Sequence, residues 1–405
     1  MLWCTKIRPW ITQNSPSEIT NLPPAAHSVA HYIRAGTIPQ MKSSDPADIP
    51  SALKNSIHKR LAPWFQRCKR PMPWRNTSDP YAIWLSEVML QQTQVATVEP
   101  YYQRFLQHFP DIDSLAAAPL EEVLKLWAGL GYYRRARSLH RAAQFIASTY
   151  HSVFPCTYDQ ILQLPGIGPY TAGAIASIAF REAVPVLDGN VMRVLTRLLL
   201  IQHDIARPQT RKLLWKIAGS LVPNKNPGDF NQAMMELGAT VCTPTRPRCE
   251  SCPLATLCAA RREHLQHRFP VRQSKSATPR ISVAAVIIRS PQGRLMARRK
   301  PGGLWEHLWE FPAFELVRPT AAGVSKHFFA LTGLRIKLKR HPATLAHQLT
   351  HRRMEYTLFT GRSLSAAKVE LDAKIASPYD AVRWITDMTS VPKSRLTEKI
   401  SALAG

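Results

Sequence analysis

The chain has 405 residues, of which 45% are hydrophobic, and this suits a globular protein of two or three domains with substantial cores. Lysine and arginine number 53 against 27 acidic residues, and the formal net charge is +26. Solubility needs a smaller charge than this, so the balance favours a polyanionic partner, most often nucleic acid. No run of 18 apolar residues occurs, and we therefore expect no membrane-spanning helix and no membrane partner.

Residues 1–50 combine scattered prolines with weak periodicity, and we interpret them as a poorly ordered N-terminal extension. A targeting peptide and an upstream start without function are the alternatives. From Ser51 onward the apolar residues follow a helical period, and no strand pattern interrupts the chain up to about residue 260. Residues 51–261 are therefore predicted to form one helical domain.

A loop at PMPWR, which ends in Trp74 and Arg75, precedes a predicted amphipathic helix over Tyr81–Thr93. Its buried side is expected to include Ile83, Val88 and Leu90. Glu87 is the one acidic residue of this helix, and a lone glutamate on a helix is usually solvated. Its apolar neighbours would instead raise its pKa if the side chain points inward.

The next helix is predicted at Leu120–Trp127 and ends at the sequence GLG. The segment YYRRARSLHR follows at 132–141, and no acidic residue occurs between Glu122 and Asp159. We interpret this run, which contains Tyr132 and Arg134, as a basic face with aromatic rings beside it. Such a face suits phosphate contact with stacking or wedging of bases, and an ordinary solvated helix face is the alternative.

A tight turn is predicted at Pro165, Gly166 and Gly168, followed by a helix of small residues over Thr171–Phe180. A glycine turn leaves backbone N–H groups bare at a helix start, where an anion such as phosphate binds. An ordinary turn between helices is the equally simple reading. About twenty residues later, Asp188 ends an apolar run closed by Gly189 and Asn190, and this predicts a shielded carboxylate.

Helices are further predicted over Val191–Leu200, Arg211–Val222 and Phe230–Ala239. Four of the seven cysteines then follow at close spacing: Cys242, Cys249, Cys252 and Cys258. This distribution favours a reduced compartment with one metal centre over a disulfide framework. A compact loop with one CxxC and no adjacent ligand histidine suits an iron–sulfur cluster better than zinc, which remains the alternative.

Residues 262–279 are predicted to be a basic linker, after which the apolar pattern changes to a period of two. Strands are predicted over Ile281–Arg289, Arg294–Arg299 and Glu355–Thr360, with a helix over Ala321–Thr332. Residues 280–405 are therefore expected to form a smaller mixed α/β domain.

Taken together, the motifs WLSEVMLQQTQVATV, WAGLGYYRRAR, LPGIGPYTAG, LDGN, FNQAMMELGA and the cysteine loop resemble the adenine DNA glycosylases (the MutY family). This family lies within the helix-hairpin-helix superfamily that includes endonuclease III. The resemblance implies a mostly α fold, with a two-subdomain helix-hairpin-helix core and an iron–sulfur loop, followed by a smaller α/β Nudix-like domain. It also implies excision of adenine mispaired with 8-oxoguanine in double-stranded DNA.

The resemblance assigns roles to individual residues. Glu87 would be the general acid that protonates the adenine, and Asp188 would stabilise the sugar cation with support from Asn190. Gln92 and Tyr132 would wedge into the duplex, while Trp74, Arg75 and Gln232 would line the adenine pocket. The cysteines would hold a 4Fe–4S cluster. These roles fit the chemistry, because breaking an N-glycosidic bond needs a proton donor for the base and an anion near the sugar. We hypothesise that burial raises the pKa of Glu87, while hydrogen bonds and the glycine-turn helix hold Asp188 as an anion.

Tyr170 stands where relatives with lyase activity have a lysine. Without an amine no Schiff base forms there, so a monofunctional glycosylase is expected. We further expect a monomer that is cytoplasmic and associated with the nucleoid if the source is bacterial, or nuclear or mitochondrial if it is eukaryotic.

In the C-terminal domain, WEHLWEFPAFEL followed by SKHFFALTGL lines up loosely with a Nudix box. His327, Ala330 and Leu331 replace the carboxylates that a hard cation needs, so pyrophosphatase activity is not expected. The resemblance implies a domain that recognises 8-oxoguanine. The family's Phe-Ser-His loop falls at Leu349-Thr350-His351, which keeps a hydroxyl and an imidazole but lacks the aromatic residue.

Three alternatives compete with this reading. The first is another base-excision glycosylase of the superfamily, against which Tyr170 and the C-terminal domain argue. The second is a non-catalytic DNA-binding iron–sulfur protein, which would not need both Glu87 and Asp188. The third is a nucleotide pyrophosphatase fused to a DNA-binding domain, which the missing Nudix acids disfavour.

Overall fold

The computed structural model describes residues 48–273, 278–349, 351–363, 369 and 377–404. The predicted extension, apart from residues 48–50, and Thr350 lie outside the described residues. The chain divides into two compact units. The first consists of Met1–Gln91 with Ser148–Ser274, and the second of Gln92–Ala147 with Lys275–Gly405.

Every regular element that the structure describes in the first unit is a helix. The α-helices are α2 (Ser51–Cys68), α3 (Pro80–Leu90), α8 (Tyr158–Leu162), α9 (Pro169–Ala179), α10 (Gly189–Leu199), α11 (Pro208–Leu221), α12 (Pro227–Thr240) and α13 (Ala259–Arg262). The short 3-10 helices are η1 (Pro73–Arg75), η2 (Cys249–Ser251), η3 (Ala255–Leu257) and η4 (Gln266–Arg268).

One core of this unit lies where α2, α10, α11 and α12 meet. Helix α2 contributes Leu53, Ile57 and Leu61, whose spacing of four residues places them on one helical stripe. Helix α9 packs against α3, α8 and α12. The close approach of α12 depends on its Gly228, because an added Cβ there would lie 2.7 Å from the carbonyl oxygen of Ser177 on α9. Helix α9 thus lies in contact with three neighbouring helices of this unit.

The second unit contains a helical part and a sheet. Its helices before residue 150 are α4 (Val95–His108), α5 (Ile112–Ala117), α6 (Leu120–Trp127) and α7 (Arg134–Tyr150), the last turn of which belongs to the first unit. The GLG sequence between α6 and α7 adopts positive φ angles at Gly129 (94°) and Gly131 (79°). A side chain is strained in that conformation, so glycine permits the sharp reversal there.

The sheet of the second unit has seven strands. They are β1 (Arg280–Ser290), β2 (Gly293–Arg299), β3 (Trp309–Glu310), β4 (Ala313–Glu315), β5 (Lys339–Gln348), β6 (Arg353–Arg362) and β7 (Tyr379–Ile385). The order is β3-β2-β1-β6-β5, with β4 on β1 and β7 on β2. Strands β1 and β6 are parallel, and the other pairs are antiparallel.

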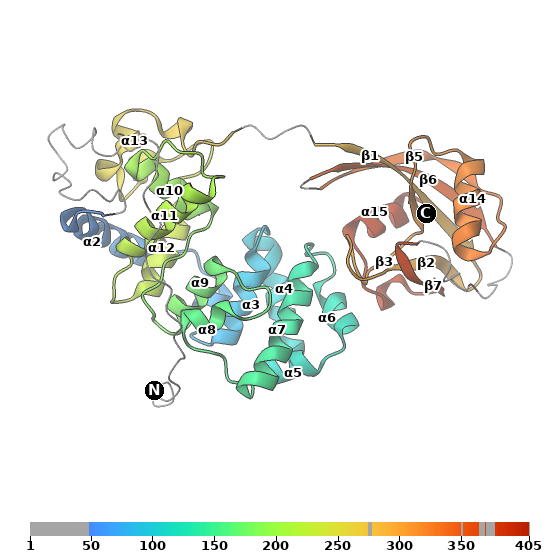
Figure 1. Cartoon of the computed structure of the whole chain (residues 1–405), viewed down its shortest axis with the longest axis horizontal. Coiled ribbons are helices and arrows are strands. Elements are labelled where there is room, and N and C mark those ends of the chain that lie inside the picture. Colours follow the sequence, from blue (N-terminus) through green and yellow to red (C-terminus); the bar gives the residue numbers. More distant parts are fainter. Residues whose placement is uncertain (1–47, 274–277, 350, 364–368, 370–376, 405) are drawn as a thin grey trace, which may run out of the picture. The chain divides into compact units, whose positions relative to one another are not determined.

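One helix covers each face of the sheet, as Figure 1 illustrates. Val283, Ala285 and Ile287 of β1 pack on the same side as α15 (Arg395–Leu403). The intervening Ala284, Val286 and Ile288 pack on the side of α14 (Ala321–Thr332). Strand β1 is therefore buried on both faces, which explains why its centre is a continuous apolar run rather than an alternating one. The short 3-10 helix η5 (Met388–Ser390) completes the elements of this unit.

The predicted fold class is confirmed: a mostly α chain ends in an α/β domain. The helices predicted at Leu120–Trp127 and Ala321–Thr332 have the predicted bounds, and the other predicted elements differ by a few residues at their ends. Within the described part of the chain, no helix combines the length and apolarity that crossing a membrane requires.

Candidate active site

Glu87 lies on α3, whose start is fixed by Asp79 and Pro80. The carboxylate of Asp79 accepts hydrogen bonds from the backbone N–H groups of Tyr81 (3.0 Å) and Ala82 (3.3 Å), and Pro80 occupies the first helical turn. Every residue from Tyr81 to Met89 is buried, and Glu87 is only 6% exposed. The predicted amphipathic character was wrong, because consecutive residues on every side of α3 are buried rather than one stripe alone. Glu87 points inward, as its apolar neighbours indicated.

The surroundings of Glu87 favour its protonated form. Burial raises the pKa of Glu87 from 4.5 to about 7, and the carboxylate of Asp188 adds to this rise. A hydrogen bond from the Tyr170 hydroxyl to Oε2 of Glu87 (2.8 Å) and the charge of Arg75 act in the opposite direction. Burial and the two carboxylates raise the pKa of Tyr170 well above its ordinary value, so the phenol stays a neutral donor. Glu87 can therefore both hold and release a proton near neutral pH.

Asp188 is the N-cap of α10 and accepts a hydrogen bond on each carboxylate oxygen. Oδ1 accepts from the backbone N–H of Val191 and Oδ2 from the side-chain amide of Asn190, both at 2.7 Å. Burial raises the pKa of Asp188, while these hydrogen bonds and the charge of Arg193 limit the rise. The expected hydrogen bonds are present, but they come from α10 rather than from the glycine-turn helix. The net direction of the pKa is upward because the carboxylate is largely shielded from water.

The structure brings Glu87 and Asp188 to one place. The charge of Asp188 contributes to the pKa of Glu87, and both charges contribute to that of Tyr170. Tyr170 lies in the first turn of α9, which packs against α3. Two carboxyl groups with different surroundings thus interact electrostatically with each other, and Tyr170 donates a hydrogen bond to Glu87, an arrangement that can separate a proton donor from an anion.

Asn190 connects Asp188 to helix α12 and to the cysteine loop. Its amide oxygen accepts a hydrogen bond from Arg193 (2.8 Å), which also donates to the carbonyl oxygens of Gly238 (2.8 Å) and Cys242 (2.7 Å). An added Cβ at Gly238 would lie 2.6 Å from Cβ of Asn190. The glycine of MELGA therefore allows α12 to approach Asn190 closely. The sequence analysis did not identify Arg193 or Gly238.

Arg75 and Trp74 belong to η1, just before α3, and Trp74 is buried. Nη2 of Arg75 contacts the carboxylate of Glu236 on α12 at 2.7 Å. Gln232 is half-buried one helical turn before Glu236. The three predicted pocket residues thus lie on η1 and α12 in the same unit as Glu87. Glu236 was missed because nothing in its local sequence marks its partner, which is 161 residues away.

Gln92 and Tyr132, the predicted wedging residues, both belong to the second unit and are exposed at turns. Their φ angles are 58° and 51°, which lie in the left-handed region that side chains rarely adopt. The ring of Tyr132 is 48% exposed and stacks 5.3 Å from the guanidinium of Arg135. Arg135 donates to Thr93 (3.1 Å) and to the carbonyl oxygen of Gly131 (3.0 Å). An exposed ring is therefore presented on a strained and supported turn, as a wedge requires.

The basic run after the GLG sequence does not form one exposed face, and this part of the prediction was wrong. Arg134 and Arg141 are exposed, but Tyr133 and Arg135 are buried. The hydroxyl of Tyr133 donates to the carbonyl oxygen of Lys393 (2.6 Å), a contact within the second unit. Helical spacing turns one side of the run inward, so only part of its charge is available to phosphate.

The predicted glycine turn precedes α9. Gly166 has a φ of 78°, and Gly168 is the N-cap of the helix without a side-chain cap. An added Cβ at Gly168 would meet no atom within 4 Å. The space in front of the first turn of α9 is thus open to an approaching group, as an anion site needs.

The four cysteines lie in a loop that two arginines of α10 hold in place. Arg197 donates to the backbone carbonyl oxygens of Thr243 (2.7 Å) and Pro244 (2.9 Å), and its Nη1 lies 3.4 Å from Sγ of Cys242. The thiols interact electrostatically with one another. Backbone N–H groups also point at Cys252 and Cys258. Among the described residues, no set of three or more His, Cys, Asp or Glu side chains is placed to hold a metal ion in this structure.

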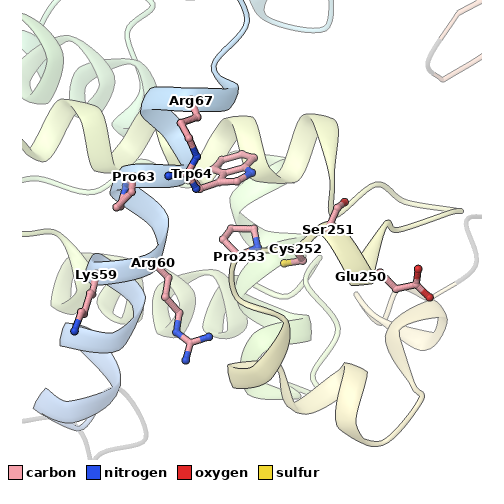
Figure 2. Close-up of a pocket in the computed structure, with 9 residues that line it drawn as sticks. All are labelled: Lys59, Arg60, Pro63, Trp64, Arg67, Glu250, Ser251, Cys252 and Pro253. Atoms are coloured by element: carbon pink, nitrogen blue, oxygen red, sulfur yellow. The ribbon is translucent and has the colours of Figure 1, made fainter.

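A surface groove of about 410 Å³ separates α2 from the cysteine loop (Figure 2). Its α2 wall consists of Lys59, Arg60, Pro63, Trp64 and Arg67, and its loop wall of Glu250, Ser251, Cys252 and Pro253. Arg60 ties the two walls through a hydrogen bond to Thr256 (2.6 Å). The cysteine loop therefore adjoins the surface through the residues around Cys252.

The predicted damage-reading loop lies at the hairpin between β5 and β6. Leu349 closes the hairpin with a backbone hydrogen bond to the carbonyl oxygen of Arg352 (2.9 Å), and His351 is exposed. The imidazole Nε2 accepts from Arg352 Nε at 2.9 Å. On α14, His327 and Ala330 are exposed and Leu331 is buried, and the helix contains no acidic residue.

Comparison with known proteins identifies two family domains. The model of the HhH-GPD superfamily of base excision DNA repair proteins matches residues 85–219, and that of the NUDIX domain matches residues 283–403. The adenine DNA glycosylase of Mus musculus is 35% identical over 436 residues, which cover 93% of this chain and 81% of the mouse protein. That of Homo sapiens is 48% identical over 234 residues, covering 56% of this chain and 43% of the human protein.

Among solved structures, a thermostable thymine-DNA glycosylase aligns with a TM-score of 0.48 and 28% identity, covering 52% of this chain and 98% of its own. A non-covalent endonuclease III–DNA complex aligns with a TM-score of 0.44 and 25% identity, covering 53% and 98%.

Proposed function

The chain belongs to the adenine DNA glycosylase family of base-excision repair, and from this premise we propose that it excises adenine mispaired with 8-oxoguanine or guanine by acid-assisted cleavage of the N-glycosidic bond. The observation that carries the proposal is the buried Glu87, whose pKa is about 7, beside the hydrogen-bonded Asp188. A carboxyl group that titrates near neutral pH suits a general acid, whereas one whose oxygens both accept hydrogen bonds suits an anion.

In the proposed reaction, Glu87 donates its proton to a ring nitrogen of the extruded adenine. The glycosidic electron pair then leaves with the base, and the sugar becomes an oxocarbenium-like cation. Asp188 stabilises that cation until a water molecule bonds to the sugar carbon and gives up one proton to the solvent. Asn190 holds Oδ2 of Asp188 in place, and Tyr170 holds Oε2 of Glu87.

Tyr170 also supports monofunctional chemistry. Its hydroxyl lies 2.8 Å from Glu87, in the position where a lyase would need an amine. A phenol forms no Schiff base with the sugar, so the product is an intact strand with an abasic site.

The base must leave the duplex before the bond can break, and extrusion costs a few kcal/mol. We propose that the exposed Tyr132 and Gln92 wedge into the stack and that Arg134 binds phosphate. The open first turn of α9 behind Gly166 and Gly168 would bind a second phosphate. Trp74, Arg75 and Gln232 would contact the extruded adenine.

We propose that the C-terminal domain reads 8-oxoguanine through the β5–β6 hairpin, where His351 is exposed. Thr350, the second residue of this loop, lies outside the described residues. The absence of acids on α14 argues against a second activity as a pyrophosphatase.

The cysteine loop would hold a 4Fe–4S cluster through Cys242, Cys249, Cys252 and Cys258. The fit rests on four cysteines in one loop whose thiols interact electrostatically, with N–H donors aimed at three of the sulfur atoms, and such donors stabilise cluster thiolates. When bound, the cluster would cross-link the loop. It would thereby hold the carbonyl oxygen of Cys242, which accepts a hydrogen bond from Arg193, and Arg193 also donates to Asn190.

The deciding experiment is incubation of the protein with a duplex that contains one adenine opposite 8-oxoguanine, followed by analysis with and without alkali. We expect strand scission at the adenine position only after alkali treatment. Scission without alkali, or a covalent adduct trapped by borohydride in high yield, would contradict monofunctional chemistry. No base release from this duplex, or equal release of an oxidised pyrimidine, would contradict the substrate assignment.

A further inference from the structure

Glu236 is a buried charged residue to which the proposed reaction assigns no role. It lies on α12, and its side chain is 1% exposed. Its carboxylate binds two arginines: Oε1 lies 2.7 Å from Nε of Arg70, and Oε2 lies 2.7 Å from Nη2 of Arg75. Arg70 adds contacts through Nη2 (3.1 Å) and its backbone N–H (3.3 Å). Burial acts to raise the pKa of Glu236, but the hydrogen bonds from the two arginines overcome it and keep the group ionised.

Three kinds of contact hold the side chain of Arg75 in place. In addition to the ion pair, Nη1 donates to the carbonyl oxygen of Arg70 at 2.9 Å. Its guanidinium carbon lies 5.4 Å from the centre of the Phe65 ring. Planar, multiply bonded arginines are well ordered, so the cation keeps a fixed position relative to α3. That position matters because the charge of Arg75 reaches Glu87.

The same helix also contacts the hydrogen-bond donor of Glu87. Met235, next to Glu236, lies 3.3 Å from the Tyr170 hydroxyl through its sulfur. Gln232 precedes Met235 and Glu236 by three and four residues, so the three share one side of α12. One side of α12 thus carries Gln232 as a candidate contact to the base, Met235 as a contact to Tyr170, and Glu236 as the ion-pair partner of Arg75.

From this geometry we propose that Glu236 is a positioning residue for excision, which fixes Arg75 at the adenine pocket and offsets its positive charge so that Glu87 keeps its proton near neutral pH. This inference rests on the proposed general-acid role of Glu87. The physical reason is electrostatic. A lone cation near a carboxyl group favours the carboxylate and so weakens the acid donor, whereas a cation paired at 2.7 Å exerts a much smaller field at a distance.

The groups that act on Glu87 come from three elements: Asp188 of α10, Tyr170 of α9 and Arg75 of η1. Replacing Glu236 leaves Asp188 and Tyr170 in place but removes the partner of Arg75. The simplest competing role for Glu236 is to tie α12 to the PMPWR loop for stability alone. A stability role predicts an equal loss of rate at every pH, because the titration of Glu87 would not change.

The test is the single-turnover rate of adenine release between about pH 5.5 and about pH 9, for the wild type and four full-length variants. Glu236→Gln removes the charge at nearly constant shape, and Glu236→Asp keeps the charge but shortens the side chain. Arg75→Gln removes the cation, and Arg70→Gln removes the other partner of Glu236. Binding to an uncleavable duplex is measured in parallel.

We expect Glu236→Gln to move the alkaline inflection to lower pH by about half a unit to one unit, which reduces the rate above it about three- to tenfold. The acid-side rate stays closer to that of the wild type. Arg75→Gln should move the inflection in the opposite direction. Glu236→Asp should leave the alkaline inflection nearly unchanged but reduce the maximal rate. Arg70→Gln should not move the inflection to lower pH.

An equal loss at all pH values in Glu236→Gln, with the inflection unmoved, would overturn the inference while the proposed function stands. If Glu236→Gln does not fold, two other variants decide the question, because an inflection that does not rise in Arg75→Gln, or that falls in Glu236→Asp, would overturn the inference. Absence of adenine release by the wild type at every pH would instead overturn the proposed function itself, and the inference with it.

Discussion

Replacing Glu87 with glutamine is the most direct perturbation of the proposed chemistry. Glutamine preserves the size of the side chain and can still contact the Tyr170 hydroxyl, which lies 2.8 Å from Glu87 in the wild type. It has no proton to transfer at any accessible pH. Because Glu87 is buried and Tyr132, the proposed wedge, is an exposed residue of the other unit, we expect binding to mismatched DNA to persist.

The size of the effect follows from the pKa of Glu87, about 7 instead of 4.5. At pH 7 about half of the wild-type molecules carry the proton, whereas an ordinary glutamate would be protonated in about one molecule in 300. Positioned general acids contribute about 10² to 10⁴ in rate. We therefore expect Glu87→Gln to lower the single-turnover rate at least about 100-fold, and the wild-type rate to fall as pH rises above about 7.

The same pKa predicts a change in stability with a defined sign. A carboxyl group whose pKa is raised by folding stabilises the protein fully below its unfolded pKa, and this contribution is lost as pH rises through about 7. The difference between 4.5 and about 7 corresponds to at most about 3 kcal/mol. Relative to the wild type, Glu87→Gln should thus gain unfolding free energy between about pH 5 and about pH 8.

Single-turnover release of adenine from a duplex with 8-oxoguanine, together with urea unfolding at the two pH values, measures both effects. Binding to the same duplex serves as the control for folding. A Glu87→Gln rate within about threefold of the wild type, where a general acid supplies about 10² or more, would refute the general-acid role. A wild-type rate that does not change across neutral pH would refute the raised pKa.

Three further predictions concern the neighbours of this carboxyl group and the second domain. Tyr170→Phe removes the hydrogen bond that lowers the pKa of Glu87, so the alkaline limb of the pH–rate profile should move to higher pH. Single-turnover rates measured as a function of pH test this shift. Gly238→Ala would place a Cβ 2.6 Å from that of Asn190, so excision should fall about tenfold or more in a single-turnover assay while DNA binding is kept. His351→Ala should weaken the preference for 8-oxoguanine over guanine, measured as a ratio of rates on the two duplexes, more than it lowers the rate opposite guanine.

The glycine substitution has a matched control in the same chain, because a Cβ at Gly303 would meet no atom within 4 Å. Gly303→Ala should therefore leave excision unchanged. Wild-type excision by Gly238→Ala would show that Asn190 can shift without loss. An alkaline limb that moves to lower pH in Tyr170→Phe would contradict the direction of the Tyr170 hydrogen bond, and equal losses opposite both bases in His351→Ala would count against damage recognition.

The sequence predicted those features that depend on short stretches of chain. Helical periodicity located α6 and α14 at their observed bounds, and the apolar context of Glu87 predicted its inward orientation. The Asp-Gly-Asn sequence likewise predicted a shielded carboxylate at Asp188. Local patterns suffice in these cases because they indicate only whether a side chain is buried and not which partners it meets, such as Tyr170, which lies 83 residues from Glu87 in the sequence.

Other features depend on contacts between distant segments, which a single sequence does not specify. Glu236 meets Arg70 across 166 residues, and Arg193 meets Cys242 across 49. The enclosure of α3 also needed the structure, since its sequence is as compatible with one buried stripe as with burial on all sides. The prediction of one exposed basic face after α6 was wrong because Tyr133 and Arg135 are buried. Their orientation depends on tertiary packing, which the charge pattern does not reveal.

The complete enclosure of α3 has a consequence for how the enzyme meets its substrate. A helix without a free side has no room to rotate or slide, so its amide protons should exchange with solvent only when the whole unit opens. Glu87, the proposed acid, would then already be in its working orientation before any DNA arrives. The exposed residues Gln92 and Tyr132 would then serve recognition. The free energy of DNA binding would be available for extruding the base, because none is needed to reorient Glu87.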